Sequence, residues 1–206
     1  MIGRLIAGFA KLISGATSLW TAPPTTAPQR VYFANHTSHL DFVIIWSALP
    51  PAMRARTRPV AGSDYWMKGP LRRYLADNVF RAILIERGSG GVTTSPTTAS
   101  KSIEQIAYGM GNDKNIIVFP EGTRSMDGEV KPFKSGLYHL CRMKPGLELV
   151  PVYLANMNRI LPKGEVLPVP LLGRVIFGSP MNMGPNEDKA AFLVRARNAL
   201  LALKNR

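Results

Sequence analysis

Short apolar runs alternate with segments of helical spacing along most of this chain, and this alternation constrains the fold more than any other feature. Each run is short enough for a single strand. The segments between them, such as LDFVIIWSALP and SGLYHLCRM, repeat their apolar residues at helical spacing. The runs span residues 30–35, 58–63, 82–87, 115–121, 148–155 and 171–179. Strands that alternate with helices predict an α/β fold, a central sheet with helices on its faces.

The N-terminal segment has a different pattern. Over residues 1–20 the apolar side chains recur at helical spacing, with Arg4 and Lys11 on the opposite side. Such a helix would be ~30 Å long, enough to span a bilayer. Lys11 would then lie near the bilayer centre, at a cost of roughly 2.5 to 3.5 kcal/mol. We therefore expect an amphipathic helix that lies on a membrane surface, with a helix packed on the core as the alternative.

The rest of the chain is predicted to form one domain. The Pro/Thr-rich segment 21–29 predicts a linker, and residues 30–206 are long enough to bury a full core. The single cysteine, Cys141, excludes an internal disulfide and a cysteine-rich zinc site. Its place in an apolar helical pattern indicates a buried side chain.

The charge balance predicts anionic partners. The chain has 26 Lys and Arg against 13 Asp and Glu, a net charge of +13, and the basic residues are dispersed rather than gathered in a tail. A negatively charged membrane and phosphorylated or CoA-type substrates fit this balance. The chain has no aromatic-basic stripe or known nucleic-acid motif, so we expect no nucleic-acid partner. A non-catalytic basic adaptor on a membrane surface remains an alternative.

The segment NHTSHLD, residues 35–41, places two histidines and an aspartate between two apolar segments. In a continuous helix His36 and Asp41 would be rotated by roughly 140° from each other. A turn capped by Thr37 or Ser38, with Asp41 in the first turn of the next helix, would let the carboxylate reach back to His36. A carboxylate on one ring nitrogen raises the basicity of the other. This geometry predicts His36 as a general base and Asp41 as its orienting partner.

Two other interpretations of this segment remain open on these residues alone. It could be a capped helix whose histidines only satisfy hydrogen bonds. It could also hold a metal through His36, His39 and Asp41, but no nearby Cys or Glu completes the ligand set, so we expect no metal. Of the two histidines, His39 has the poorer route to the carboxylate, which makes His36 the better candidate base.

The segment VFPEGTRS, residues 118–125, is the second candidate. An apolar strand ends there in a crowded polar turn. Gly122 permits close backbone approach, and the planar guanidinium of Arg124 suits a phosphate. Lys131 and Lys134 can add positive charge nearby. An ordinary polar turn would explain Gly122 but not an arginine beside a glutamate at the end of an apolar strand.

Two further segments give weaker signals. Glu86 and Arg87 end a predicted strand, where ion pairs are common. Pro151 lies inside the apolar run LVPVYL, and because proline cannot donate a backbone hydrogen bond it predicts an edge strand, a bulge or a pocket wall. The chain has no nucleophile elbow, P-loop or dinucleotide fingerprint.

The segments NHTSHLD, AILIERG, VFPEGTRS and LVPVYL follow the order of the four blocks of the glycerophospholipid acyltransferases. Over roughly residues 30–180 the chain resembles the 1-acyl-sn-glycerol-3-phosphate (lysophosphatidate) acyltransferase family. The His-x4-Asp and Phe-Pro-Glu-Gly-Thr-Arg blocks carry most of this resemblance. The chain departs from the family pattern at Glu86, where aspartate is more common, and in being short, without additional hydrophobic spans.

The resemblance implies roles for individual residues. His36 would be the catalytic base and Asp41 would orient it. Val150 and Pro151 would lie in the acyl-donor region. The acceptor phosphate would be held by Arg87, Glu121, Gly122, Thr123 and Arg124. Supporting roles are expected for Asn35, Ser38, Glu86 and Lys134.

The resemblance also implies a fold and an activity. The fold would be a mixed central sheet flanked by helices, with the predicted N-terminal amphipathic helix added to it. The activity would be transfer of a fatty acyl group from acyl-CoA or acyl-carrier protein to the free hydroxyl of a lysophospholipid. The first acceptor is 1-acylglycerol-3-phosphate, which gives phosphatidate, and another lysolipid such as an amino-acid lipid is the alternative. The donor is a co-substrate, so no cofactor is implied, and we expect a peripheral or monotopic protein on the cytoplasmic face of an anionic membrane.

Overall fold

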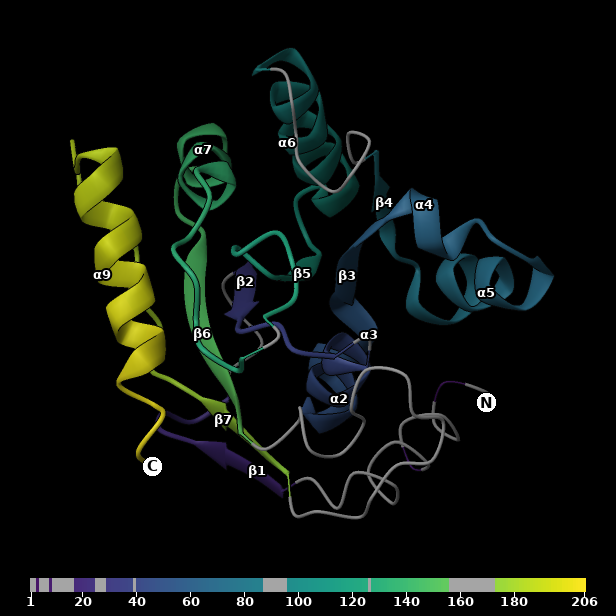
Figure 1. Ribbon diagram of the computed structural model, residues 1–206, viewed down its shortest axis with the longest axis horizontal. Helices are drawn as coiled ribbons and strands as arrows, with labels where there is room; N and C mark the ends of the chain where they lie inside the picture. The colour runs from purple at the N-terminus through teal and green to yellow at the C-terminus, as the bar shows by residue number, and fades with distance from the viewer. Residues whose placement is uncertain are drawn as a thin grey trace.

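A computed structural model describes residues 3, 8, 17–24, 29–38, 40–86, 96–125, 127–155 and 173–206 of the chain. They contain a seven-stranded sheet with the strand order β1-β7-β6-β2-β5-β3-β4 (Figure 1). Its strands are β1 (Thr17–Trp20), β2 (Arg30–Ala34), β3 (Thr57–Gly62), β4 (Ile83–Ile85), β5 (Asn115–Val118), β6 (Glu148–Ala155) and β7 (Arg174–Phe177). Neighbouring strands are parallel except for the antiparallel pair β6–β7, so the predicted mixed sheet is confirmed.

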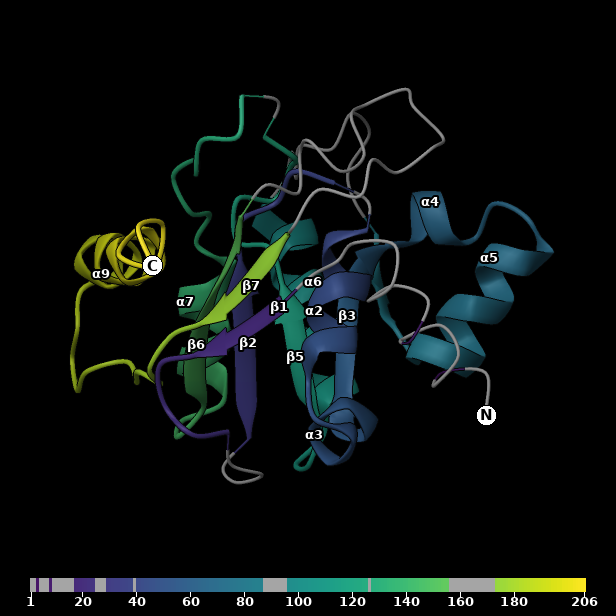
Figure 2. The same cartoon turned by 90° about the horizontal axis from the view of Figure 1, so that it is seen from below.

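Helices cover both faces of this sheet (Figures 1 and 2). The helices of the described residues are α2 (Asp41–Ala48), α3 (Pro51–Arg56), α4 (Ser63–Trp66), α5 (Pro70–Tyr74), the π-helix η1 (Leu75–Phe80), α6 (Pro96–Met110), α7 (Gly136–Met143) and α9 (Lys189–Leu201), of which α5 lies away from the sheet. Alternate residues of β2 enter opposite cores because successive side chains of a strand point to opposite faces. Val31 and Phe33 pack with α6, α7 and α9, whereas Tyr32 and Ala34 pack with α2. Cys141 is buried in the first core, as predicted.

The N-terminal prediction fails at its last four residues. Thr17–Trp20 form β1, which pairs in parallel with β7. The Trp20 ring, expected on the apolar face of a helix, stacks on Phe177 with the ring centroids 3.9 Å apart. Because pairing with β7 satisfies the backbone of these residues, the folded body includes Thr17–Trp20, which precede the predicted boundary at residue 30. Segment 21–29 therefore connects two strands of one sheet, and most of the predicted helix lies outside the described residues.

Pro151 lies in an interior strand, because β6 is flanked by β7 and β2. The prediction of an edge strand is therefore wrong, and the alternative of a bulge is the better description. Val152 pairs with Phe177 whereas Leu149 bridges Met181, so the β7 side has one residue more over this stretch. Pro151 sits at this offset, just beyond the last β7 pair, where its carbonyl accepts from the Gly178 N–H at 2.8 Å. Because proline has no N–H, this pair with Gly178 keeps only one bond, and the register shifts by one residue just beyond it.

The space around Pro151 explains the glycine opposite it. A Cβ atom on Gly178 would lie 2.7 Å from Cγ of Pro151, closer than a side chain tolerates. The proline ring therefore packs against a backbone that has no side chain. None of the described helices is both long and apolar enough to cross a membrane.

Candidate active site

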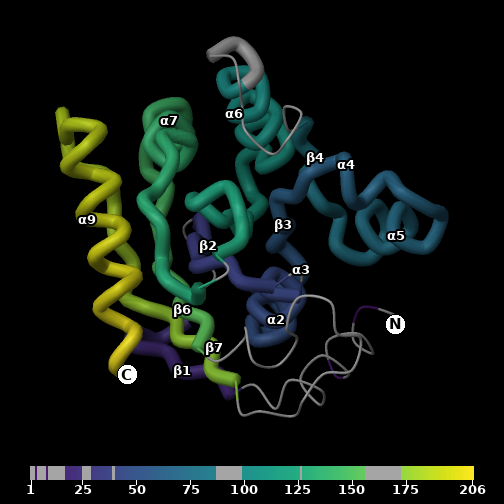
Figure 3. Tube along the Cα trace, in the orientation of Figure 1, coloured from purple at the N-terminus to yellow at the C-terminus, as the bar shows by residue number. Residues whose placement is uncertain are grey.

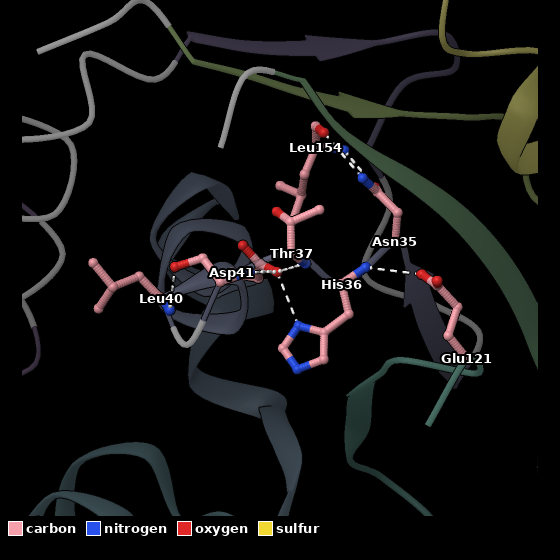
Figure 4. Close-up of polar contacts among 8 residues, drawn as sticks. Asn35, His36, Thr37, Leu40, Asp41, Glu121 and Leu154 are labelled. Carbon is pink, nitrogen blue, oxygen red and sulfur yellow. Dashed lines mark hydrogen bonds and ion pairs between the residues drawn. The ribbon is translucent and has the colours of Figure 1, made fainter. Parts of the chain in front are cut away.

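His36 lies just beyond the end of β2, where Asn35 lets the backbone leave the sheet. The Asn35 amide donates to the Leu154 carbonyl at 3.0 Å, and its oxygen accepts from the Leu154 N–H at 2.8 Å (Figure 4). The side chain therefore replaces one step of backbone pairing with β6. Since Asn35 is buried, this paired contact fixes the point at which His36 emerges.

The His36 ring is held by the carboxylate of Asp41, the first residue of α2. Nδ1 of His36 lies 2.9 Å from Oδ2 of Asp41, whose side chain is fully buried. Because a carboxylate only accepts hydrogen bonds, Nδ1 carries the proton of the neutral ring and Nε2 keeps its lone pair. Figure 4 shows Nε2 on the side of the ring away from Asp41. The predicted contact across the turn is confirmed.

The turn between the two residues is built differently from the prediction. Neither Thr37 nor Ser38 caps α2, whose N-cap residue is Leu40 without a side-chain cap. The backbone N–H groups of Thr37 and Ser38 instead donate to Oδ2 of Asp41, at 2.6 and 2.8 Å. The Ser38 hydroxyl accepts from the Leu40 N–H at 3.3 Å instead. One carboxylate oxygen therefore orders both the loop and the imidazole.

Glu121 holds the backbone of His36 from the other side. Its Oε1 accepts from the His36 N–H and its Oε2 from the Lys131 N–H, both at 2.9 Å. The His36 carbonyl in turn accepts from the Ser125 N–H at 2.7 Å. Burial raises the pKa of the Glu121 carboxyl, although the hydrogen bonds from Lys131 and His36 oppose this rise. The family resemblance implied that Glu121 holds the acceptor phosphate, whereas its buried carboxylate here braces the segment that carries His36.

The remaining residues of the VFPEGTRS turn face two different cavities. Gly122 has a φ of 76°, and a Cβ there would lie 2.8 Å from the Lys134 side chain, so the predicted close approach at this glycine is confirmed. Gly122 and Lys134 line a larger cavity of about 950 Å³. Thr123 and Arg124 line a smaller cavity of about 340 Å³.

His36 lies where the two cavities meet. It lines both of them, together with Val60 and Phe119, and its ring stacks on Phe119 with the centroids 4.1 Å apart. The larger cavity has aliphatic walls from α6 and α7, namely Ile103, Ile106, Leu137 and Leu140, and Glu86 also lines it. The smaller one combines Arg124 with the aromatic side chains Phe42, Tyr65 and Trp66. A base at this junction can reach groups bound on either side of it.

A protein-family model described as Acyltransferase matches residues 23–155, which include both the His36–Asp41 segment and the VFPEGTRS turn. The chain belongs to the Acyltransferase family. A 1-acyl-sn-glycerol-3-phosphate acyltransferase of Limnanthes douglasii is 30% identical over 181 residues, which cover 83% of this chain and 57% of that protein. The chloroplastic 1-acyl-sn-glycerol-3-phosphate acyltransferase BAT2 of Brassica napus is 42% identical over 150 residues, which cover 69% and 37%. The chain thus spans about half the length of the curated relatives it matches.

The fold of this acyltransferase-family chain is shared with a solved structure. The crystal structure of the 1-acyl-sn-glycerophosphate (LPA) acyltransferase PlsC from Thermotoga maritima matches 99% of this chain and 77% of its own, with a TM-score of 0.70. The two sequences are 19% identical, so this likeness concerns the fold.

Some predicted site residues of this family member lie away from the cavities. Val150 and Pro151 lie within β6, with Val150 buried in the α2 core, and neither lines the two cavities described above. Arg87 and His39 lie outside the described residues. The structure therefore tests neither the predicted phosphate contact of Arg87 nor the alternative metal site that includes His39. No group of three or more His, Cys, Asp or Glu that could hold a metal occurs within the described ranges. The sequence did not single out Phe119, which stacks on His36. Its position beside Pro120, at the end of β5, is the one feature of the sequence that could have indicated a role at the site.

The bracing role of Glu121 in this family member predicts a specific kinetic change. In Glu121→Gln one acceptor oxygen becomes an amide nitrogen, so either the His36 or the Lys131 N–H loses its partner. We expect the free energy of unfolding to fall by about 1–3 kcal/mol. We also expect kcat for acyl transfer to fall while KM for the acceptor stays unchanged, because the defect displaces His36 rather than the substrate.

Glu129→Gln is the matched control, since Glu129 is an exposed glutamate of the same loop, paired on the surface with Lys204. It should change neither kcat nor stability measurably. A raised acceptor KM with an unchanged kcat in Glu121→Gln would instead place this carboxylate at the acceptor.

Proposed function

We propose that this protein transfers a fatty acyl group from acyl-CoA or acyl-carrier protein to the free hydroxyl of 1-acylglycerol-3-phosphate, giving phosphatidate. The observation that carries the proposal is the position of His36, with Nδ1 held by Asp41 and the ring at the junction of an apolar cavity and an arginine-lined one. The names of the relatives support the choice of acceptor. The net charge of +13 suits anionic substrates, an anionic acyl donor and an anionic membrane alike.

The reaction proceeds by general-base catalysis. Nε2 of His36 takes the hydroxyl proton as the acceptor oxygen attacks the thioester carbonyl. The new C–O bond forms, the C–S bond breaks, and the proton passes from His36 to the departing thiolate. Asp41 stabilises the imidazolium that forms in between. A general base contributes about 10² to 10⁴ in rate, and positioning of the two substrates supplies much of the rest.

A covalent acyl-enzyme is not part of this mechanism. The single cysteine, Cys141, is buried, and burial raises the pKa of its thiol to about 12, so it carries almost no thiolate at neutral pH. The acceptor hydroxyl itself is the nucleophile that His36 activates.

The two cavities suit the two ends of the substrates. The aliphatic wall of the larger cavity favours an acyl chain, since burial of methylene groups is the main favourable term for such a ligand. Arg124 and Thr123 in the smaller cavity offer a charged and a neutral hydrogen-bond donor to the acceptor phosphate. We further propose that the reaction takes place at the cytoplasmic face of a membrane, with the protein bound there as a peripheral or monotopic protein.

The phosphate role of Arg124 predicts a change in acceptor binding. Arg124→Gln should raise KM for lysophosphatidate roughly 10-fold with little change in kcat, because a charge-assisted hydrogen bond to the phosphate is lost. Monoacylglycerol, which has no phosphate, is the control acceptor, and its slower acylation should be the same in the parent and the variant. An equal loss with both acceptors would mean that Arg124 does not bind the phosphate.

The direct test is acyl transfer to radiolabelled lysophosphatidate in anionic vesicles, with long-chain acyl-CoA and acyl-carrier protein as donors. Formation of phosphatidate supports the proposal. Product with another lysolipid, such as an amino-acid lipid, and none with lysophosphatidate would retain the acyltransferase and correct the acceptor. Absence of transfer to every lysolipid would favour a non-catalytic membrane adaptor and overturn the proposal.

A further inference from the structure

An arm formed by residues 63–80 extends from the edge of the sheet between β3 and β4 (Figures 1 and 3). It consists of α4, α5 and η1. Its tip, residues 67–74 with the sequence MKGPLRRY, is exposed at every position. Three of the exposed side chains are large and apolar: Met67 is 47% exposed, Leu71 70% and Tyr74 46%.

The base of the arm is anchored in the core, although α5 at its tip buries none of its own residues. The Phe80 ring lies in the α2 core, with its centroid 5.0 Å from that of Phe42 and 5.3 Å from that of Trp46. Ala76 is fully buried. Leu71 and Tyr74 are three apart along a helix and so share one face of it. Large apolar side chains that project into solvent beyond an anchored base indicate a contact surface.

The charges at the tip indicate which kind of partner would cover it. The segment 67–74 contains Lys68, Arg72 and Arg73 and no acidic residue. Arg72 lies over the Tyr65 ring at 4.3 Å, and Arg73 pairs on the surface with Asp77 at 3.7 Å. Apolar and basic side chains are therefore interspersed on one projecting element. Such a mixture is typical of segments that bind at the interface of anionic membranes.

We propose that the arm tip docks on the surface of an anionic lipid bilayer. Met67, Leu71 and Tyr74 enter the interfacial layer, and the three basic side chains lie among the phosphate head groups. A projecting tip suits a bilayer because lipid closes around it, whereas a protein partner would have to supply a matching groove. Each basic residue close to such a surface strengthens binding about fivefold.

The position of the arm connects this surface with the candidate active site. Tyr65 and Trp66, at the base of the arm, line the smaller cavity together with His36 and Arg124. A bilayer at the tip would therefore lie beside the cavity assigned to the acceptor lipid. This second step rests on the proposed function, whereas the docking itself does not.

A dye at the tip tests the contact directly. In Leu71→Cys the new thiol can be labelled with the environment-sensitive dye NBD, because Cys141 is buried and has a strongly raised thiol pKa. Val194→Cys is the matched control: Val194 is 59% exposed on α9, which lies on the opposite side of the molecule from the arm (Figure 1). We expect vesicles of phosphatidylcholine and phosphatidylglycerol to shift the emission of the dye at position 71 to the blue and to leave position 194 unchanged. No shift at position 71, or equal shifts at both positions, would overturn the proposal.

The charges at the tip are tested separately from the total charge. Arg72→Gln with Arg73→Gln should weaken partitioning of the full chain to these vesicles about 25-fold. Lys101→Gln with Lys189→Gln removes the same charge from exposed sites on α6 and α9 and should have a much smaller effect. Equal weakening by the two pairs would overturn the proposal. So would a dye at position 71 that responds to an acidic acyl-carrier protein and not to vesicles.

The same variants separate this proposal from the proposed function. With the acceptor dissolved in detergent, the Arg72→Gln and Arg73→Gln chain should transfer acyl groups as fast as the parent. If no chain transfers acyl groups but the dye at position 71 still responds to vesicles, the docking surface stands and the proposed function fails.

Discussion

Replacement of His36 by alanine is expected to lower the rate of acyl transfer about 10²- to 10⁴-fold. The substitution removes Nε2 at the junction of the two cavities, and no other described side chain there is held by a buried carboxylate. The fold should persist, because the backbone of His36 is still fixed through its bonds to Glu121 and Ser125. Initial rates with both substrates saturating and a thermal unfolding curve measure the two effects independently.

The other two histidines provide the controls for this result. His139 lines the larger cavity from α7, and His39 is the neighbouring histidine of the same motif. His39→Ala and His139→Ala should each keep a rate within a few-fold of the parent, on the order of the effect of losing a peripheral contact. Full activity in His36→Ala would refute the general-base mechanism, and a loss confined to His39→Ala would move the base to that residue.

The sheet could be predicted from the sequence because its strands are marked locally. Each of β2 to β7 falls within or overlaps a predicted apolar run, since strands buried on both faces are nearly continuous in apolar residues. Thr17–Trp20 could not be assigned in this way. Trp20 continues the helical spacing of the segment before it, and only pairing with β7, far along the chain, makes these four residues a strand.

The same distinction between local and distant contacts holds for the candidate site. His36 and Asp41 are close in sequence, so the geometry of a single turn was enough to predict their contact. The position of Glu121 depends on backbone N–H groups of His36 and Lys131, and no pattern of residue types encodes such bonds. The offset beside Pro151 likewise depends on how β7 pairs with β6. Contacts between distant backbone segments were therefore the part that local patterns could not supply.

Asp41 has two tasks that different substitutions can separate. Its Oδ2 accepts from Nδ1 of His36 and from the N–H groups of Thr37 and Ser38. Asp41→Ala leaves the buried N–H of Ser38 and the half-buried N–H of Thr37 without an acceptor and should lower the free energy of unfolding by about 3–5 kcal/mol. Without the carboxylate, Nδ1 of His36 is no longer fixed as the protonated nitrogen. The rate of acyl transfer should therefore fall by on the order of 10³ to 10⁴.

Asp41→Asn should keep the geometry and remove only the charge. The asparagine oxygen can take the place of Oδ2 and accept all three hydrogen bonds, while its NH₂ group takes the place of Oδ1, which is buried and has no partner within the described chain. We expect a loss of about 1–3 kcal/mol in stability and a rate reduced about 10- to 100-fold, because a neutral amide stabilises the imidazolium less than a carboxylate does. Urea denaturation and single-turnover rates of the two variants measure this difference. If Asp41→Asn is as active as the parent, the charge of Asp41 has no part in catalysis. If Asp41→Asn is as unstable as Asp41→Ala, the asparagine amide does not restore the turn, and the rate of this variant does not measure the effect of the charge.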